Sequence, residues 1–352
     1  MTQKSTVRVA FIDVGQGDTI VISVPETGEA VIVDCTDSEA VISYLEKYKI
    51  RFLRGLIITH LHLDHYKGAM SLINNVKSVL NISCERVLFY NDTDKVLKKM
   101  RNDEDGHSQD LINNKSRRSK DLLTEFIRWA QSNREKFNSL AIQPGGIALP
   151  LPDIIEFIHP WHIDISDLMK QGLNDTSGVF KVKGTCTSAL LTGDLEPSGF
   201  KCVIKNHKNL QSDVLKFPHH GAWKNSDPKE LIDAVNPSVV IISVGTEGSK
   251  YGHPNSHVLK ALREYPRIRL LCTQVTEQCS EDIEKHYTKI VEKFKKYEVG
   301  TDSYFAEQKG CPCAGTIIIE LGEILTVLQP DMEFHCNQII KSHFSKPKCR
   351  LS

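Results

Sequence analysis

Three histidines and an aspartate lie close together in the segment Thr59-His60-Leu61-His62-Leu63-Asp64-His65. The segment directly follows the end of an apolar run, residues 55–59, that is typical of a strand. Because a strand cannot bury so many polar side chains in a core, we expect the chain to turn here and direct them toward one point. Imidazole nitrogens and a carboxylate oxygen are preferred ligands of Zn²⁺, Mn²⁺ and Fe²⁺. The segment therefore predicts a metal site; the alternative is a polar surface loop that happens to contain three histidines.

The elements around this segment alternate between strand-like and helix-like patterns. Residues 38–48 place apolar residues at helical spacing after the cap candidates Asp37 and Ser38, and residues 227–235 and 257–264 are further helix candidates. Apolar runs rich in Val and Ile, bounded by Gly, Pro or Asp, predict strands. These runs are residues 7–14, 19–24, 30–34, 56–59, 154–158, 178–183, 188–192, 213–217 and 238–244. Strands punctuated by helices in both halves of the chain indicate an α/β layered architecture.

The composition excludes several classes of protein. Lys and Arg together number 44, as do Asp and Glu, so no net charge would attract nucleic acid or an anionic membrane. No stretch reaches the roughly 18 apolar residues of a membrane span, and the first residues lack the apolar core of a secretory signal. We therefore expect a cytoplasmic protein without membrane insertion.

Ten cysteines at irregular spacing do not resemble a small secreted disulfide scaffold. Cys311 and Cys313, with His335 and Cys336 downstream, are candidates for a small structural zinc site. The spacing is C-x-C rather than C-x-x-C, and cysteine is among the residues most often buried, so buried thiols are the alternative.

Four further motifs carry chemically similar residues. They are Asp34 at the end of the run VIVD, Asp194 in LTGD, the pair His219 and His220 in PHHG, and His253 in YGHP. Together with H-x-H-x-D-H at the end of a strand, and in this order, they resemble the metallo-β-lactamase fold family. The resemblance implies an α/β fold, a four-layer αββα sandwich, with a C-terminal extension.

Within that family the chain is most similar to the soluble metallo-β-lactamase domain of ComEC-type DNA-uptake proteins. The segments that carry the similarity span residues 8 to about 265 and are FIDVGQGDTIVI, FIHP, NDTS, LLTGDLEP, DVLKFPHHG and SVGTEGSKYGHP. We therefore expect a metallo-β-lactamase-like domain at residues 1–280, with a charged, partly helical insertion at 91–136. Residues 281–352 would form an extension that packs on or flanks the sandwich, with a helix at 281–296, a hairpin at 316–328 and a helix at 333–344. Unlike ComEC-type proteins the chain has no spanning helices, so a channel role would need a separately encoded protein partner.

The resemblance implies two divalent ions, Zn²⁺ or Mn²⁺, held by histidines and carboxylates that share one bridging aspartate. The implied ligands are His60 and His62 for one ion and, for the other, Asp64, His65 and either His219 or His220, with Asp194 bridging. Most hydrolases of the family add a third histidine to the first set shortly before the TGD motif, and here no histidine lies between His162 and Asp194. Asn174 or Asp175 would face the metal in its place, with His159 as a weaker candidate.

Asp64, His220 and His253 are the catalytic residues that the resemblance implies. A second histidine of the HHG pair and His253 would contact the scissile group or protonate the leaving oxygen. Asp34 would orient a ligand histidine. The alternatives are that Asp34 caps the helix that begins after Asp37 and that His253 is a turn residue before a proline.

Two weaker features surround these motifs. Gly15 and Gly17 predict a tight turn whose backbone lies near the site, because the third glycine of a dinucleotide fingerprint is absent and a strand follows. Four lysines lie close in sequence to the metal motifs and are candidates for neutralising a phosphate: Lys67, Lys216, Lys224 and Lys250.

The ligand set predicts a metal-dependent hydrolase, since two ions that share a carboxylate can activate a water. The resemblance adds the substrate and implies a phosphodiesterase or nuclease acting on DNA or RNA. The alternative is the same chemistry on a phosphorylcholine-type ester, a cyclic nucleotide, a lactam or a thioester. A second alternative is a binding or scaffold module that keeps the fold without turnover.

Overall fold

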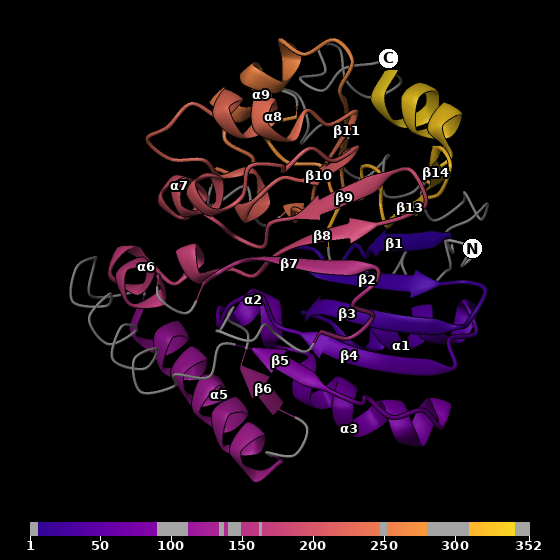
Figure 1. The fold of residues 1–352 in the computed structure, drawn as a ribbon, viewed down its shortest axis with the longest axis vertical. Helices are drawn as coiled ribbons and strands as arrows, with labels where there is room; N and C mark the ends of the chain where they lie inside the picture. The colour runs from indigo at the N-terminus through magenta and orange to yellow at the C-terminus, as the bar shows by residue number, and fades with distance from the viewer. Residues whose placement is uncertain are drawn as a thin grey trace.

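Two β-sheets pack face to face, and helices cover the outer side of each sheet (Figure 1). The computed structural model describes residues 6–89, 112–133, 137–139, 149–161, 164–246, 252–279 and 310–341. The layers are therefore helix, sheet, sheet and helix, and the predicted αββα sandwich is confirmed. Within the described ranges, no helix is both long enough and apolar enough to cross a lipid bilayer.

The first sheet has eight strands in the order β14-β13-β1-β2-β3-β4-β5-β6. The strands β3 to β6 are parallel to one another, and the other neighbours are antiparallel. Their bounds are β1 Val7–Phe11, β2 Thr19–Val24, β3 Glu29–Cys35, β4 Phe52–Ile57, β5 Val87–Phe89, β6 Phe137–Ser139, β13 Ile317–Leu321 and β14 Leu325–Gln329.

The second sheet has six strands in the order β12-β11-β10-β9-β8-β7. The strands β9 to β12 are parallel, so their carboxyl ends meet at one edge of the sheet. The bounds are β7 Ile155–His159, β8 Val179–Lys183, β9 Ser188–Leu191, β10 Val214–Lys216, β11 Val239–Ile242 and β12 Arg269–Cys272.

Helices pack against the outer face of each sheet (Figure 1). Beside the first sheet are α1 Ser38–Lys47, α3 Ala69–Leu80 and α5 Ile112–Ser132, and beside the second are α7 Pro197–Asn206, α8 Lys229–Val235 and α9 Ser256–Arg263. The other helical segments are α2 Leu63–Tyr66, α6 Ile165–Gln171, η3 Asn174–Thr176, η4 His219–Gly221 and the π-helix η6 Phe334–Ile340. The start of α1 is capped by Asp37, which accepts hydrogen bonds from the N–H groups of Glu39 and Ala40.

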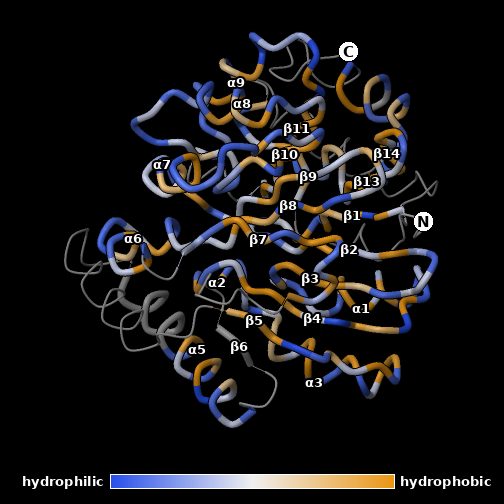
Figure 2. Tube along the Cα trace, in the orientation of Figure 1, coloured by the Kyte–Doolittle hydropathy of each residue, from blue (hydrophilic) through white to orange (hydrophobic). Residues whose placement is uncertain are grey.

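Alternating side chains along the strands supply separate cores. In β2, Ile20 and Ile22 pack between the two sheets, whereas Val21 between them packs against the helices. This period of two is the pattern of a strand buried on both faces. Along α1 and α3, short groups of apolar residues are separated by polar residues (Figure 2). This spacing is expected for a helix that packs one face on a core.

Several predicted element bounds differ from the structure for local reasons. The first strand ends at Phe11 rather than 14, because the chain then turns through the Gly15–Gly17 loop. The strand β4 begins four residues earlier than predicted, because the charged Arg54 interrupts its apolar sequence. In the structure Arg54 forms ion pairs with Glu29 and Glu85. The helices α3, α6 and α7 were not predicted, although α3 buries Ala69, Leu72 and Val76 at helical spacing.

The C-terminal hairpin is part of the first sheet. Strand β13 pairs antiparallel with β1, and its residues Ile317, Ile319 and Leu321 pack in the core between the sheets. The predicted last helix contains the π-helix η6. The predicted helix at 281–296 and the boundary at 280 lie outside the described residues, as do residues 91–111 and 134–136 of the predicted insertion. The rest of that insertion contains α5, where Leu123 and Phe126 are buried against the first sheet.

A buried aspartate ties the end of β1 to two distant loops. Oδ1 of Asp13 accepts hydrogen bonds from the N–H of Gly15 (3.2 Å) and from Nε2 of Gln274 (2.8 Å), and the N–H of Asp13 donates to Oγ1 of Thr316 (3.1 Å). Burial raises the pKa of Asp13 to about 7, although these two hydrogen bonds to Oδ1 partly offset it.

The raised pKa predicts a pH-dependent stability. The native state holds the Asp13 proton more tightly than the unfolded chain, so this stabilisation is present at low pH and is lost as pH rises through about 7. Asp13→Asn keeps the acceptor and stays neutral. We expect it to raise the melting temperature relative to the wild type at about pH 8, and by less at about pH 5, measured by circular dichroism. The exposed Asp121→Asn is the control, and an equal effect of Asp13→Asn at both pH values would contradict the account.

Candidate metal centre

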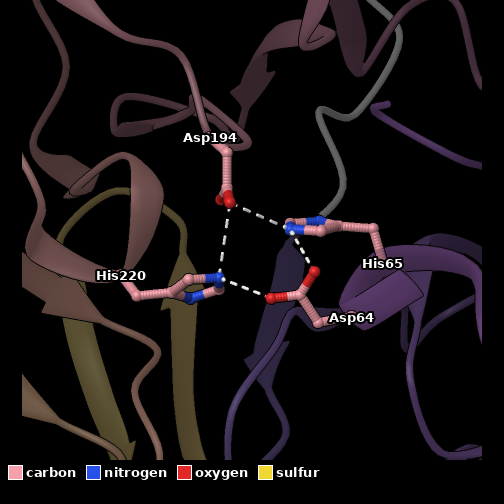
Figure 3. Close-up of side chains that lie close together, drawn as sticks. All are labelled: Asp64, His65, Asp194 and His220. Atoms are coloured by element: carbon pink, nitrogen blue, oxygen red, sulfur yellow. Dashed lines mark ion pairs between the residues drawn. The ribbon is translucent and has the colours of Figure 1, made fainter. Parts of the chain in front are cut away.

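Four side chains converge on one point between the two sheets: Asp64, His65, Asp194 and His220 (Figure 3). Oδ2 of Asp194 lies 3.2 Å from Nε2 of His65 and 3.4 Å from Nε2 of His220. The carboxylate of Asp64 closes the ring, at 3.4 Å from Nε2 of His220 and 3.9 Å from Nε2 of His65. These oxygen and nitrogen atoms have the chemistry and the spacing of a metal-ligand set.

The two sheets supply these residues from the carboxyl ends of parallel strands. Asp64 and His65 lie in α2 directly after β4 of the first sheet. Asp194 follows β9 and His220 follows β10, and both strands belong to the second sheet. Ligands bind outside the carboxyl ends of strands in layered α/β proteins, and the side chains in Figure 3 point toward one another from both sheets.

Asp34 holds His65 in position. Oδ2 of Asp34 accepts from Nδ1 of His65 (2.7 Å) and from the hydroxyl of Thr59 (2.7 Å), and Oδ1 accepts from the Thr59 N–H (2.7 Å). Asp34 has a left-handed backbone, with φ of 59°, which is uncommon for a residue with a side chain. Asp37, rather than Asp34, caps α1. The carboxylate of Asp34 instead accepts a hydrogen bond from His65.

The loop before β2 lies against the back of the site. Gly17 has φ of 127°, and a Cβ atom there would lie 2.4 Å from the backbone oxygen of Asp64 and 2.6 Å from Oγ1 of Thr36. The N–H of Asp18 donates to the same Asp64 oxygen at 3.1 Å. Only glycine permits this approach, which explains the tight turn that the sequence predicts near the site.

In this cluster the neighbouring aspartates raise the pKa of each histidine, and the neighbouring histidines lower the pKa of each aspartate. Burial alone would lower the pKa of His220, but Asp194 and Asp64 outweigh it and raise the pKa to about 10. Burial would likewise lower the pKa of His65, yet Asp194 and Asp34 raise it well above its usual value. Burial would raise the pKa of Asp64 and Asp194, and the histidines hold both below the usual range. The carboxylates are therefore ionised and attract positive charge to this point.

The donor set fits a divalent metal ion. Nε2 of His65, Nε2 of His220 and Oδ1 of Asp194 are buried and make no hydrogen bond within the part of the chain that the structure describes. Buried polar atoms without hydrogen bonds are rare and need another partner. Two imidazole nitrogens and carboxylate oxygens are ligands that a divalent ion of the Zn²⁺ or Mn²⁺ type accepts.

His60 and His62 adjoin this group on one side. Nε2 of His60 lies 3.0 Å from Nδ1 of His62 and 4.0 Å from Oδ2 of Asp194. Nδ1 of His60 lies 3.2 Å from the hydroxyl of Thr59 and 3.3 Å from that of Ser177. The ring is thereby held with Nε2 toward the Asp194 carboxylate and His62.

The residues considered in place of a third histidine have different surroundings. Asp175 caps α7, where it accepts from the Ser198 hydroxyl and from the Gly199 N–H (2.7 Å). Nε2 of His159 donates to the backbone oxygen of Asp175 (2.9 Å). Asn174 lies nearer the centre, and its Nδ2 donates to Oε1 of Glu196 at 3.1 Å.

The remaining predicted site residues lie at the edge of the cluster. Nε2 of His219 is 3.9 Å from Oδ2 of Asp194, and the rings of His219 and His253 are 5.3 Å apart. Burial and the nearby histidines lower the pKa of His253 to about 4, which leaves its ring neutral near pH 7. Sequence reasoning missed Glu196, which lies two residues after Asp194 in LTGDLEP but carries no local signal that links it to a histidine.

A buried ion pair lies beside Asp194. Nζ of Lys216 pairs with Oδ2 of Asp18, donates to the backbone oxygen of Gly193 (2.8 Å), and lies 3.8 Å from Oδ1 of Asp194. Lys216 and Asp18 are fully buried, so Lys216 cannot neutralise a bound phosphate by contact. Burial would lower the pKa of Lys216, but Asp18 and Asp194 raise it above the usual value. Of the other lysines, Lys67 and Lys224 are exposed, and Lys250 lies outside the described residues.

The cysteine segment does not form such a cluster. Sγ of Cys313 lies 3.5 Å from Nε2 of His335, and burial raises the pKa of Cys311 to about 12. Among the described residues, neither cysteine belongs to a group of three or more candidate ligand atoms.

The comparisons with known proteins agree with this geometry. Residues 12–79, which include Asp34 and the segment from His60 to His65, match the model of the metallo-beta-lactamase superfamily. The chain has the metallo-β-lactamase fold. It is 26% identical over 285 residues to ComE operon protein 3 of Bacillus subtilis (strain 168). That match covers 76% of this chain and 32% of the relative, so the chain spans about a third of that protein.

Solved structures give weaker likenesses. The short form of human tRNase Z is 12% identical, with a TM-score of 0.36, and the match covers 77% of this chain and 93% of that one. A long-form RNase Z from yeast is 11% identical, with a TM-score of 0.32, over 68% of this chain and 37% of that one.

The Lys216–Asp18 pair predicts a large effect on stability. Lys216→Met leaves the Asp18 carboxylate buried without its partner, which should lower the free energy of unfolding by about 3–5 kcal/mol in EDTA-treated protein. Adding Asp18→Asn should recover most of the loss, because the buried charge is then removed. Urea denaturation measures both. Lys229→Met, which breaks the surface pair with Glu264, is the matched control and should change little. A Lys216→Met variant with the wild-type free energy of unfolding would contradict this role of the ion pair.

Proposed function

We propose that the chain is a metal-dependent phosphodiesterase that cleaves nucleic acid, using two divalent ions held on either side of Asp194. The observation that carries the proposal is the convergence of Asp64, His65, Asp194 and His220, with His60 and His62 adjoining the same carboxylate. One set of ligands would comprise Asp64, His65 and His220, and the other would contain His60 and His62.

The chain's own residues have separate tasks in this proposal. Divalent ions bound here would act as Lewis acids, lowering the pKa of a water and neutralising charge on a phosphoryl oxygen. Asp34 orients His65 through the 2.7 Å hydrogen bond, and Lys216 balances the charge of Asp18 behind Asp194. Burial and nearby histidines lower the pKa of His253 to about 4, so its ring is neutral near pH 7 and could form a hydrogen bond with a substrate bound beside His219.

The choice of a phosphodiester rests on two supports. The ordered motifs resemble ComEC-type DNA-uptake proteins, and the chain is similar to ComE operon protein 3 over 76% of its length. In addition, Lys224 is exposed and close enough to Glu196 and His253 to contribute to the lowering of both pKa values. An exposed cation beside a metal centre suits a substrate with negative charge.

Cleavage of end-labelled single-stranded DNA tests the proposal. We expect cleavage with added Mn²⁺ or Zn²⁺, no cleavage with EDTA, and loss of cleavage to the EDTA level in Asp64→Ala and Asp194→Ala, because each removes a metal ligand. Both variants should keep a near-native circular dichroism spectrum. The exposed Asp167→Ala, purified identically, is the control and should cleave like the wild type.

The outcomes separate the substrate from the site. Retained cleavage in both Asp64→Ala and Asp194→Ala would overturn the assignment of these residues. Intact DNA in the presence of bound metal would contradict the DNase activity, and RNA, cyclic nucleotides and small phosphodiesters would be the next substrates. Binding of nucleic acid without cleavage under any metal would favour a binding module.

A further inference from the structure

Four histidine rings face a single oxygen atom. Oδ2 of Asp194 lies 3.2 Å from Nε2 of His65, 3.4 Å from His220, 3.9 Å from His219 and 4.0 Å from His60. These distances lie at or beyond the upper limit of an N–H···O hydrogen bond. Hydrogen bonding therefore does not explain why four rings are turned toward this atom, whereas ligand atoms around shared ions would have this spacing.

In each ring the other nitrogen is engaged by an acceptor. Nδ1 of His65 donates to Asp34 (2.7 Å), Nδ1 of His220 donates to the backbone oxygen of Ser243 (2.8 Å), and Nδ1 of His60 lies 3.2 Å from the Thr59 hydroxyl. His219 follows the same rule, since its Nδ1 lies 3.3 Å from Oε1 of Glu196. Histidines that bind metals almost always donate their second N–H to a carboxylate, carbonyl or similar group.

The backbone of the HHG segment directs two consecutive rings toward Asp194. His219 and His220 both have left-handed conformations, with φ of 48° and 52°, and Gly221 continues the turn with φ of 84°. Such backbone is unfavourable at a residue with a side chain and persists where the surroundings enforce it. In an extended strand, neighbouring side chains point to opposite faces, and only one of the two could reach Asp194.

Glu196 is itself held in place. It precedes Pro197 at the start of α7 and has an extended backbone, with φ of −97° and ψ of 170°. Its Oε1 also accepts from Nδ2 of Asn174 at 3.1 Å, and this amide nitrogen lies 3.4 Å from both nitrogens of the His219 ring. Asn174 and Glu196 together therefore confine His219 to one orientation.

We propose that His219 completes the ion site of His60 and His62, and that Glu196 is the residue that positions it. The two histidines of the HHG pair then serve different ions, His220 on one side of Asp194 and His219 on the other. Asn174 acts through Glu196 rather than as a ligand. The inference rests on the proposed two-metal site, but its test needs no substrate.

Metal titration of the metal-stripped full chain tests this division. Isothermal titration calorimetry with Mn²⁺ and Zn²⁺ gives the affinities, and elemental analysis after gel filtration gives the ions per chain. The wild type should bind two ions, and His219→Asn should bind one with unchanged affinity. Asparagine is chosen because it tolerates the left-handed backbone of this position but is too short to replace the imidazole. Glu196→Ala should weaken one ion about 10–100-fold, and Glu196→Gln should weaken it less, because the amide oxygen still accepts from Nδ1.

Double variants locate the lost ion. Combining His219→Asn with His60→Ala should still leave one ion, because both changes act on the same site. Combining His219→Asn with His220→Asn should leave none. His207→Asn, at a half-buried histidine outside the cluster, and the exposed Glu230→Ala are the matched controls and should bind two ions. Circular dichroism establishes that each variant is folded.

Two results would overturn the inference. The first is wild-type affinity for both ions in His219→Asn. The second is a wild type that binds fewer than two ions. A wild type that binds two ions but cleaves no nucleic acid contradicts the proposed function alone, and the assignment of His219 then stands on the binding data.

Discussion

The buried carboxylate of Asp194 is the interaction on which the site depends. An ionised carboxylate in a protein interior is unfavourable unless positive charge or hydrogen-bond donors compensate it. Here the compensation comes from both sheets: His65 from the first, His220 from the second, and Lys216 from behind. The contacts of one side chain therefore require the two sheets to meet at their carboxyl ends. The fold can be understood as the frame that keeps these groups together.

The support around that carboxylate is built from residues that do not face the centre. Asp34 holds His65, Lys216 pairs with Asp18, and Gly17 lets the first loop lie against Asp64. Several of these contacts need backbone that side chains disfavour, such as the φ of 59° at Asp34. Strain of this kind gathers at functional sites because tight packing elsewhere can offset it. These supporting contacts also hold the rings and carboxylates in place before any ion binds, which reduces the reorganisation that metal binding requires.

Sequence reasoning predicted the layered fold because strand periodicity and ordered motifs are local signals. The strand Thr19–Val24 and the helix that starts at Ser38 follow directly from apolar spacing and an Asp cap. The approach of distant residues was not predictable in the same way. That Lys216 is buried against Asp18, and that Asp175 caps α7 rather than facing the centre, depend on how two sheets pack. Glu196 was missed because nothing local marks a glutamate before a proline as the partner of a histidine 23 residues later.

Anomalous diffraction from crystals grown with Zn²⁺ would test the central claim, that Asp194 is shared between two ions, most directly. The account predicts two peaks flanking Asp194, one bonded to His65 and His220 and the other to His60 and His62, with Zn–N distances of about 2.0–2.1 Å. A single peak that leaves His60 and His62 without metal would contradict the shared carboxylate. Peaks that do not contact Asp194 would contradict the account of the site as a whole.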